Sequence, residues 1–266
     1  MIDEFKKILH HPEVLKEIRY FIEYGKTLPY YTNYFGVNFN SQGLVSVKLY
    51  FSFFEIPDDK IFKKYNINPT FLKALKENWK SEPDKKYIHQ GITLGLKCYV
   101  KNEKIEINSY VHYRCSNYHL GFPKGLNLTD LDKENYPGFC LENHDWGSEV
   151  KRYYYISDPI TKQKLLSEFE LEDKIKVTDL SFIEYTESEV EKKINLITNN
   201  SSSVKNVLES LNNSKIIDFS HYLFKEHELY YFAPGFRHQK DTVAIYYLPK
   251  SLYYEIGNIN TIDSLL

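Results

Sequence analysis

Cysteines, glycine-rich motifs and long apolar runs are all scarce in this chain of 266 residues. The three cysteines form no close pair such as CxxC, and their odd number in a chain of this size predicts reduced thiols. Neither a P-loop nor a GxGxxG motif is present, so a phosphate group would have to be held by side chains. No apolar run is long enough to span a bilayer, and the N-terminus lacks an apolar signal region. We therefore expect a cytoplasmic protein with no membrane partner.

Net charge is also small, because 34 basic residues face 36 acidic ones. A net charge of −2 argues against bulk electrostatic capture of nucleic acid, although it leaves room for a local basic pocket. The nine histidines show no ligand spacing that would indicate zinc. The expected partners therefore include no nucleic acid, and we expect no metal site.

Tyrosine, in contrast, is abundant, with 24 residues in the chain. Its apolar body and polar tip suit the wall of a cavity that is wet or holds a charged ligand. The chain is 42% hydrophobic, which is ample for a core, and shows no clear interdomain linker. These features predict a single domain over residues 1–266.

Residues 44–54 alternate as a β-strand does, with side chains on opposite faces at a period of two. One face is apolar from Val45 to Phe53, whereas the other carries Lys48 and Tyr50 between serines. Residues 92–101 repeat this plan, with Lys97 and Tyr99 on the polar face. If the two strands are neighbours, cations and phenols gather on one face of a sheet.

The remaining pattern predicts about ten strands with paired helices between strand pairs. The capping box Thr186-x-x-Glu189 predicts a helix that continues through Val190, Ile194 and Ile197. Residues 117–148 lack clear periodicity and are expected to form a long loop. Further helices are expected over residues 3–26 and 58–65, from Pro69 onward, and over 159–169, with strands over 30–40, 104–116, 150–156, 174–185, 215–224, 228–233 and 241–248.

Two architectures satisfy this order of elements. In one, an open sheet leaves its polar face, with Lys48 and Lys97, in water. In the other, the sheet closes into a barrel with helices outside and the polar, aromatic face inward. So many exposed tyrosines would be unusual, which favours the second. The predicted fold class is α+β, an antiparallel closed β-barrel of about ten strands with a solvent-side ring of helices.

Short motifs on these strands carry a resemblance to a known family. They are Val47-Lys48-Leu49-Tyr50-Phe51, preceded by Gly36-Val37-Asn38-Phe39-Asn40, then Leu94-Gly95-Leu96-Lys97-Cys98-Tyr99, and a third basic-x-Tyr tripeptide, Arg152-Tyr153-Tyr154. With the strand-strand-helix-helix order, they resemble the ABBA-fold aromatic prenyltransferases, which include soluble bacterial, fungal indole and cyanobactin peptide enzymes. The resemblance is best over residues 30–116.

The resemblance implies a soluble prenyltransferase with the barrel of that family. Such an enzyme moves an isoprenyl group from dimethylallyl or geranyl diphosphate to an aromatic small molecule or a peptide side chain. The resemblance implies that no cofactor is required. Magnesium assists some members of the family, and others do without it. The catalytic base is not identified from the sequence.

Candidate site residues follow from this chemistry. A diphosphate needs several cations, which form charge-assisted hydrogen bonds with it. The candidates for this role are Lys48, Lys97, Arg114 and Arg152. Aromatic faces stabilise an allylic cation and keep water from it. The candidates for shielding that cation are Tyr50, Tyr99, Tyr154 and Tyr246.

A different class of function also fits the sequence. The chain could be a non-catalytic protein on an α+β scaffold that binds a small ligand or another protein. In that case Lys48 and Lys97 would be solvated side chains, and the tyrosines would be ordinary strand formers.

Overall fold

A computed structural model of the chain defines the arrangement of most of its length. It describes residues 1–25, 27, 31–53, 56–66, 68–69, 72–73, 76, 90–101, 104–115, 138–144, 147–198, 203, 207–209, 213–226, 229–240 and 242–249. The side chains of some of these residues, mainly in the fifth and sixth strands, are also outside this description. The helix expected from Pro69 falls largely outside it.

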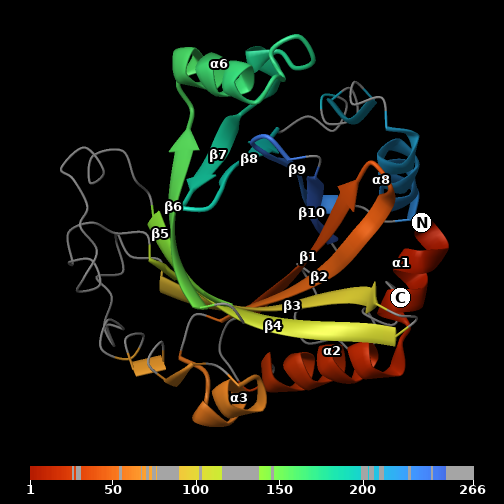
Figure 1. The fold of residues 1–266 in the computed structure, drawn as a ribbon, viewed down its shortest axis with the longest axis vertical. Coiled ribbons are helices and arrows are strands. Elements are labelled where there is room, and N and C mark those ends of the chain that lie inside the picture. Colours follow the sequence, from red (N-terminus) through yellow and green to blue (C-terminus); the bar gives the residue numbers. More distant parts are fainter. Residues whose placement is uncertain are drawn as a thin grey trace.

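Helices and strands alternate along the chain in the order shown in Figure 1. The helices are α1 (Ile2–Leu9), α2 (Pro12–Gly25), α3 (Asp59–Lys64), α6 (Pro159–Glu168), the short η2 (Val177–Asp179) and α8 (Ser214–Glu226). The strands are β1 (Tyr31–Asn40), β2 (Gly43–Phe53), β3 (Gln90–Lys101), β4 (Lys104–Cys115), β5 (Gly138–His144), β6 (Gly147–Ile156), β7 (Phe182–Glu187), β8 (Lys192–Ile197), β9 (Leu229–Arg237) and β10 (Val243–Pro249). The α+β class is confirmed.

The described strands form one antiparallel sheet whose neighbours mostly follow the chain order. Each strand from β1 to β10 pairs with the next, and β10 also pairs with β1, so that the order is a closed circuit. Such a barrel leaves no strand edge unpaired. It has one face turned outward and one face turned toward the lumen, and we call the latter the lumen face (Figure 1).

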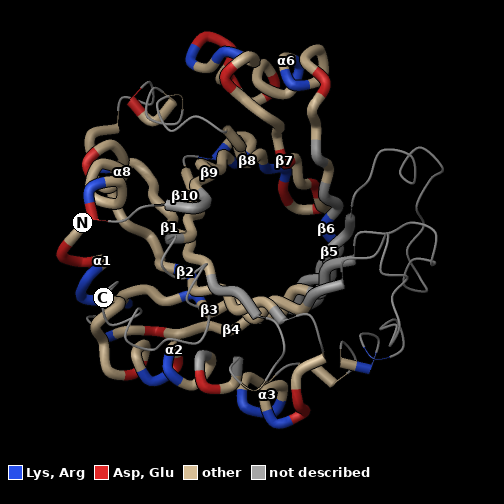
Figure 2. Tube along the Cα trace, turned by 180° about the vertical axis from the view of Figure 1, so that it is seen from behind, with Lys and Arg blue, Asp and Glu red and all other residues tan. Residues whose placement is uncertain are grey.

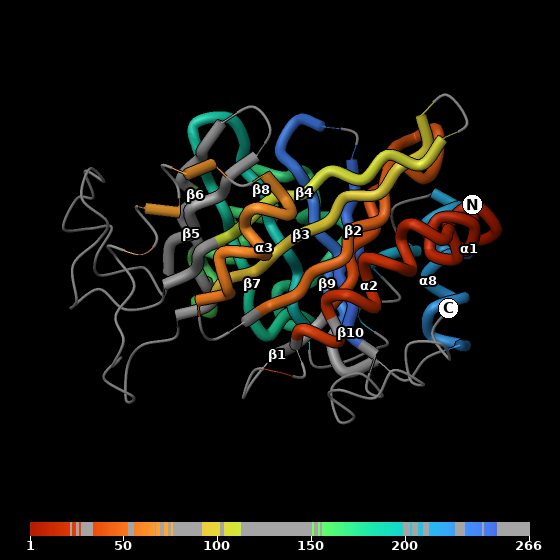
Figure 3. Tube along the Cα trace, turned by 90° about the horizontal axis from the view of Figure 1, so that it is seen from below, coloured from red at the N-terminus to blue at the C-terminus, as the bar shows by residue number. Residues whose placement is uncertain are grey.

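The apolar face of the first strands points outward, against helices α1, α2, α3 and α8. Phe21 of α2 is fully buried there and stacks on Phe51 of β2, with ring centroids 4.2 Å apart. The outward rows of β2 and β3 contribute further apolar side chains, among them Val47, Leu49 and Leu96. Figure 3 shows α2 and α3 lying across the outside of β2–β4. The large hydrophobic core therefore lies between sheet and helices, which leaves the lumen free for polar side chains.

A second apolar cluster lies outside β7 and β8, under α6 and the segment that follows it. Leu166 of α6 is fully buried there against Ile183 and Ile194. The helix begins after Asp158, whose carboxylate accepts a hydrogen bond of 2.7 Å from the backbone N–H of Thr161. Helix capping and apolar burial together hold α6 on the outer face of the sheet.

Two of the expected elements are wrong. The helix predicted from the Thr186–Glu189 capping box is instead the turn between β7 and β8, in which Ser188 Oγ accepts hydrogen bonds from the backbone N–H groups of Val190 and Glu191. The strand predicted over 215–224 is helix α8, whose buried residues Ile216, Phe219 and Leu223 recur at helical spacing.

Two boundaries also differ from the expectation. Part of the predicted loop over 117–148 contains the hairpin of β5 and β6, and the rest of it lies outside the described residues. The strand predicted over 174–185 begins at Phe182, after the 3₁₀ turn Val177–Asp179.

Replacing Phe21 with alanine tests whether α2 packs on the outer face. Because Phe21 is fully buried between Phe51 and Tyr65, Phe21→Ala should lower the free energy of unfolding by about 3–5 kcal/mol. Ile160 of α6 is 68% exposed, so Ile160→Ala should change the free energy of unfolding by less than about 0.5 kcal/mol. Urea denaturation measures both, and equal losses would show that α2 does not pack there.

Candidate functional site

Three glycines on the lumen face make room for aromatic rings. A Cβ atom on Gly95 would lie 2.2 Å from Cζ of Tyr110, and one on Gly36 would lie 3.1 Å from the ring of Tyr246. Gly235 similarly lies under Asn195, whose Oδ1 would be 2.4 Å from an added Cβ. At these positions the absence of a Cβ lets neighbouring side chains lie close against the sheet.

A cluster of tyrosines lines this part of the lumen. Tyr34 and Tyr50 stack with centroids 4.3 Å apart, and Tyr110 meets Tyr50 edge to face at 6.0 Å. Tyr246 lies 6.1 Å from Tyr50 on the other side. Burial, together with Tyr110 and Tyr246, raises the pKa of Tyr50 far above its usual value, so Tyr50 stays a neutral phenol. The wall is therefore aromatic, uncharged at Tyr50, and largely shielded from bulk water.

Cations oppose one another directly on the lumen face. Lys48 of β2 pairs in register with Lys97 of β3, and Lys193 of β8 pairs in register with Arg237 of β9. Like charges directly opposite on neighbouring strands are destabilising. Lys48 and Lys97 are half-buried, and neither has a hydrogen bond or ion pair with any residue that the structure describes. Two ammonium groups without a described counter-ion therefore lie side by side on the lumen face.

The electrostatics of Lys48 reflect this crowding. Burial lowers its pKa to about 8, with further lowering by Arg237 and Lys193 and a partial offset from Tyr246. The pKa of Lys97 is also lowered, mainly by burial and then by Arg237. With a pKa of about 8, Lys48 remains largely protonated at neutral pH.

Tyr246 lies among these cations. Lys193 Nζ donates a hydrogen bond of 2.7 Å to the Tyr246 oxygen and lies 4.1 Å from the centroid of its ring. The register places Tyr246 opposite Gly36, and Gly36 opposite Lys48 on its other side. The three strands β10, β1 and β2 thereby bring a phenol and an unpaired ammonium to the same row.

Glu191, in the turn between β7 and β8, holds Arg237 in place. Its carboxylate accepts hydrogen bonds from Arg237 Nε at 2.9 Å and from Lys151 Nζ at 3.1 Å. Burial opposes ionisation, but these two cations outweigh it and lower the pKa of Glu191 to about 2. The two terminal nitrogens of Arg237 have no acceptor in the described part of the chain, so they are available to a ligand.

One buried carboxylate also faces the lumen. Asn195 Nδ2 of β8 donates a hydrogen bond of 2.6 Å to Glu184 Oε1 of β7, and both side chains are buried. Asn195 lies on the same face of β8 as Lys193, two residues away. The site therefore combines cations, aromatic faces and one oriented carboxylate.

The structure brings together four of the eight residues predicted from the sequence. Lys48, Lys97, Tyr50 and Tyr246 all lie on the lumen face. Tyr99 also lies on the lumen face, near the end of β3. Its hydroxyl donates a hydrogen bond of 2.6 Å to the carboxylate of Glu106. It is therefore farther from the cluster than expected.

Of the other predicted residues, Tyr154 is not brought into this cluster. Tyr154 packs with Tyr185 in the outer cluster under α6 and donates a hydrogen bond of 2.5 Å to Glu187, so its shielding role is corrected. The cause is the pleat, since Tyr154 pairs with the outward-facing Tyr185. Arg114 and Arg152 lie in β4 and β6, but their side chains are outside the described part of the chain.

Sequence reasoning missed Lys193, Arg237, Glu184 and the tyrosines at 34 and 110. Lys193 fell in the segment predicted as a helix, although its neighbours Ile194 and Leu196 alternate with Asn195 as in a strand. Arg237 lies beyond the predicted end of its strand. The alternation over 192–197 was the signal that could have found Lys193.

The described residues hold neither a metal-ligand cluster nor a helix suited to a membrane. No group of three or more His, Cys, Asp and Glu residues arranged to hold a metal ion occurs among those described. Within that same portion, none of the helices has the length and apolar character needed to cross a membrane.

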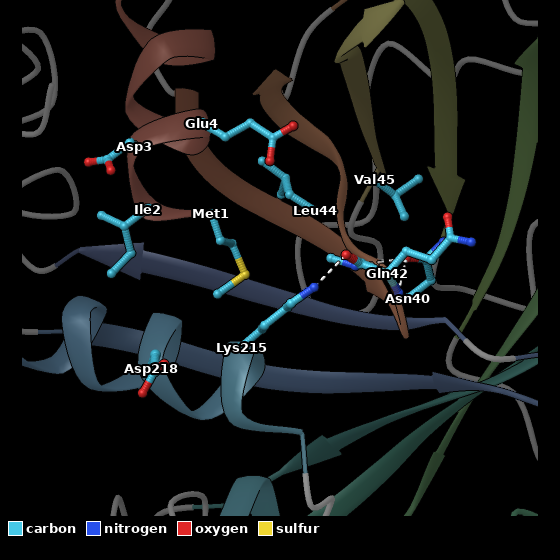
Figure 4. Close-up of a pocket in the computed structure, with 11 residues that line it drawn as sticks. Met1, Ile2, Asp3, Glu4, Asn40, Gln42, Leu44, Val45, Lys215 and Asp218 are labelled. Atoms are coloured by element: carbon cyan, nitrogen blue, oxygen red, sulfur yellow. Dashed lines mark hydrogen bonds between the residues drawn. The ribbon is translucent and has the colours of Figure 1, made fainter.

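A hollow outside the barrel, of about 700 Å³, lies between the N-terminus, the β1–β2 turn and α8 (Figure 4). Asp3, Glu4 and Asp218 are among its lining residues, whereas Lys215 is engaged by the carbonyl oxygen of Gln42 at 2.5 Å. Figure 2 shows charges of both signs spread over the outer helices. The outer hollow thus differs from the lumen face, where Lys48 and Lys97 have no hydrogen bond or ion pair with a described residue.

Comparison with known proteins adds no relative to this description. The chain matches no protein-family model, and no match was found among curated protein sequences.

Removing the Glu191 carboxylate should destabilise the protein in a pH-dependent way. With a folded pKa of about 2 against an ordinary 4.5, Glu191 contributes stability that is present above pH 4.5 and lost as the pH falls toward about 2. Glu191→Gln should therefore cost about 2–3 kcal/mol at neutral pH and progressively less in acid.

The matched control is Glu189→Gln in the same turn. Glu189 is exposed, so its replacement should change the free energy of unfolding by less than about 0.5 kcal/mol. Urea denaturation between neutral pH and about pH 3 measures both variants. A cost at Glu191 that does not change with pH would contradict the assigned ion pairs.

Proposed function

We propose that the protein is a prenyltransferase that moves an isoprenyl group from an allylic diphosphate to an aromatic or peptide side-chain acceptor. The observation that carries this proposal is the pair of opposed, unpaired lysines Lys48 and Lys97 on a lumen face lined by tyrosines. An anion with an apolar tail matches such a surface, because the cations take the phosphates and the rings take the hydrocarbon.

The proposal extends to the fold. The helices lie outside strand pairs, as expected for the barrel of ABBA prenyltransferases, and β1–β4 carry the motifs that resemble that family. Strand pairs separated by helices over most of the described chain support this assignment. The apolar core outside the sheet leaves the lumen to the substrates.

The diphosphate would lie among Lys48, Lys97, Lys193 and Arg237. Charge-assisted hydrogen bonds from ammonium and guanidinium groups are stronger than those between neutral groups. Arg237 would contribute its two terminal nitrogens, because only Nε is held by Glu191. Four cations can balance a diphosphate from side chains, and magnesium would be an optional aid.

Chemistry would begin when the allylic C–O bond breaks and its electron pair leaves with the diphosphate. Tyr50 and its stacked neighbour Tyr34 would present ring faces to the allylic cation, each contributing about 0.5–2 kcal/mol when water is excluded. The acceptor then donates a π electron pair to form the new C–C bond. The ring proton would pass to a carboxylate, and our candidate is Glu184, which Asn195 orients from the neighbouring strand.

Binding of the donor is the first test. An unreactive dimethylallyl thiolo-diphosphate should raise the melting temperature of the protein, with or without magnesium. The shift should be lost or strongly reduced in Lys48→Ala and in Lys97→Ala, because each variant removes a cation of the cluster. Lys215→Ala, which changes a cation outside the barrel, should keep the full shift.

Catalysis is tested separately from binding. Incubation with dimethylallyl or geranyl diphosphate and a panel of indoles, phenols and peptides should yield products heavier by one isoprenyl unit, as measured by mass spectrometry. Donor binding without any product would favour a non-catalytic ligand-binding protein. The absence of a thermal shift with every isoprenyl diphosphate would reject the proposed function.

A further inference from the structure

The hydroxyl of Tyr246 has an unusual hydrogen-bonding position. Its oxygen accepts a hydrogen bond from Lys193 Nζ at 2.7 Å, in a side chain that is only 9% exposed. A neutral phenol would also have a proton to donate, yet Tyr246 donates to no residue that the structure describes. A phenolate has no proton that needs an acceptor, and its hydrogen bond from the Lys193 ammonium is stronger than that of a neutral phenol.

Three cations in the lumen surroundings of Tyr246 favour a negative oxygen there. Lys193 on β8 contacts it, and Lys48 on β2 and Arg237 on β9 act on it over a longer range. Its ring neighbour Tyr50 is a neutral phenol, because burial raises its pKa far above the usual value, and Tyr34 of β1 stacks on Tyr50. The carboxylate of Glu184 accepts a hydrogen bond from Asn195, and that of Glu191 accepts hydrogen bonds from Arg237 and Lys151.

Burial and the neighbouring cations act on the pKa of Tyr246 in opposite directions. Burial alone raises the pKa of Tyr246, but Lys193, Lys48 and Arg237 together outweigh it and lower the pKa to about 7. Near neutral pH the ligand-free lumen therefore holds both phenol and phenolate, and above it mostly phenolate. A tyrosinate here would offset part of the repulsion between the opposed cations.

We propose that Tyr246 is the exchangeable anion of the empty lumen. Its phenolate balances the cations when no ligand is bound, and it takes up one proton from solvent when a diphosphate group occupies the same cations. The resulting phenol then donates a hydrogen bond to a phosphate oxygen. This inference rests on the proposed function, because it assigns the diphosphate to the cluster around Lys193.

The exchange has a direct consequence for affinity. The protonated form of Tyr246 accepts the ligand, so the affinity for an anion should fall by up to about tenfold for each pH unit above the pKa of Tyr246. Lys48 also loses its proton as the pH passes about 8, which weakens binding further. Affinity alone cannot separate the two residues, and a readout specific to tyrosine is needed.

The test is the ultraviolet absorbance of tyrosinate at about pH 8, one unit above the pKa of Tyr246. Wild-type protein without ligand should show close to one phenolate that Tyr246→Phe lacks. The control Tyr110→Phe changes another buried lumen tyrosine and should keep the signal. Saturation with inorganic diphosphate, or with the dimethylallyl thiolo-diphosphate, should erase the wild-type signal.

Four outcomes would overturn the inference. Tyr246→Phe could retain the full phenolate signal, or the signal of the wild type could persist in the saturated complex. If the phenolate depends on Tyr246 but neither anion binds, the exchange and the proposed function are both rejected, and Tyr246 remains a fixed counter-ion. If the anions bind and no phenolate exists in the free protein, the function stands and the inference fails.

Should Tyr246→Phe fail to fold, Lys193→Gln gives the same information. Removing the ammonium that contacts the phenol oxygen should move the appearance of the phenolate to higher pH, because Lys193 is the largest of the lowering effects. An unchanged titration curve in this variant would show that the phenolate arises at another tyrosine.

Discussion

The structure depends on the side-chain alternation of its strands, combined with a core that lies outside the sheet. Phe21 and the other helix residues cover the apolar rows of β1–β3, so the polar rows have only the lumen to face. Residues that would be solvated on an open sheet are thereby enclosed together. Lys48 and Lys97 become neighbours in a half-buried place because Val47 and Leu49 are needed outside.

Enclosing like charges has a free-energy cost, and the lumen contains partial compensation for it. Glu191 neutralises the Arg237–Lys151 side, and Tyr246 lies against Lys193. No described group pairs with Lys48. An anionic ligand between these cations would reduce that cost, and this is the basis of the proposed function.

The first four strands could be predicted from the sequence, because their alternation is strict and each apolar row is long. Prediction failed where a short pattern fits two periods: Val190, Ile194 and Ile197 suit a helix, although residues 192–197 form a strand. The opposite error occurred at 215–224, where a strand was predicted and the structure has helix α8. This helix buries Phe219 against a distant part of the chain. Tertiary contacts decided both cases.

The site was predictable to a similar extent. Lys48, Lys97 and Tyr50 follow from neighbouring strands, whereas the pairing of Lys193 with Arg237 joins strands separated by a long stretch of chain. Nothing in local periodicity gives that register. The orientation of Glu184 likewise depends on Asn195 across a hairpin that the sequence did not predict.

A crystal structure with an unreactive dimethylallyl thiolo-diphosphate tests the central claim most directly. We predict phosphate oxygens within hydrogen-bond distance of Lys48 and Arg237, and the isoprenyl chain against the ring of Tyr50. The account would be contradicted by a Lys48 side chain directed into bulk solvent, or by an anion bound only outside the barrel.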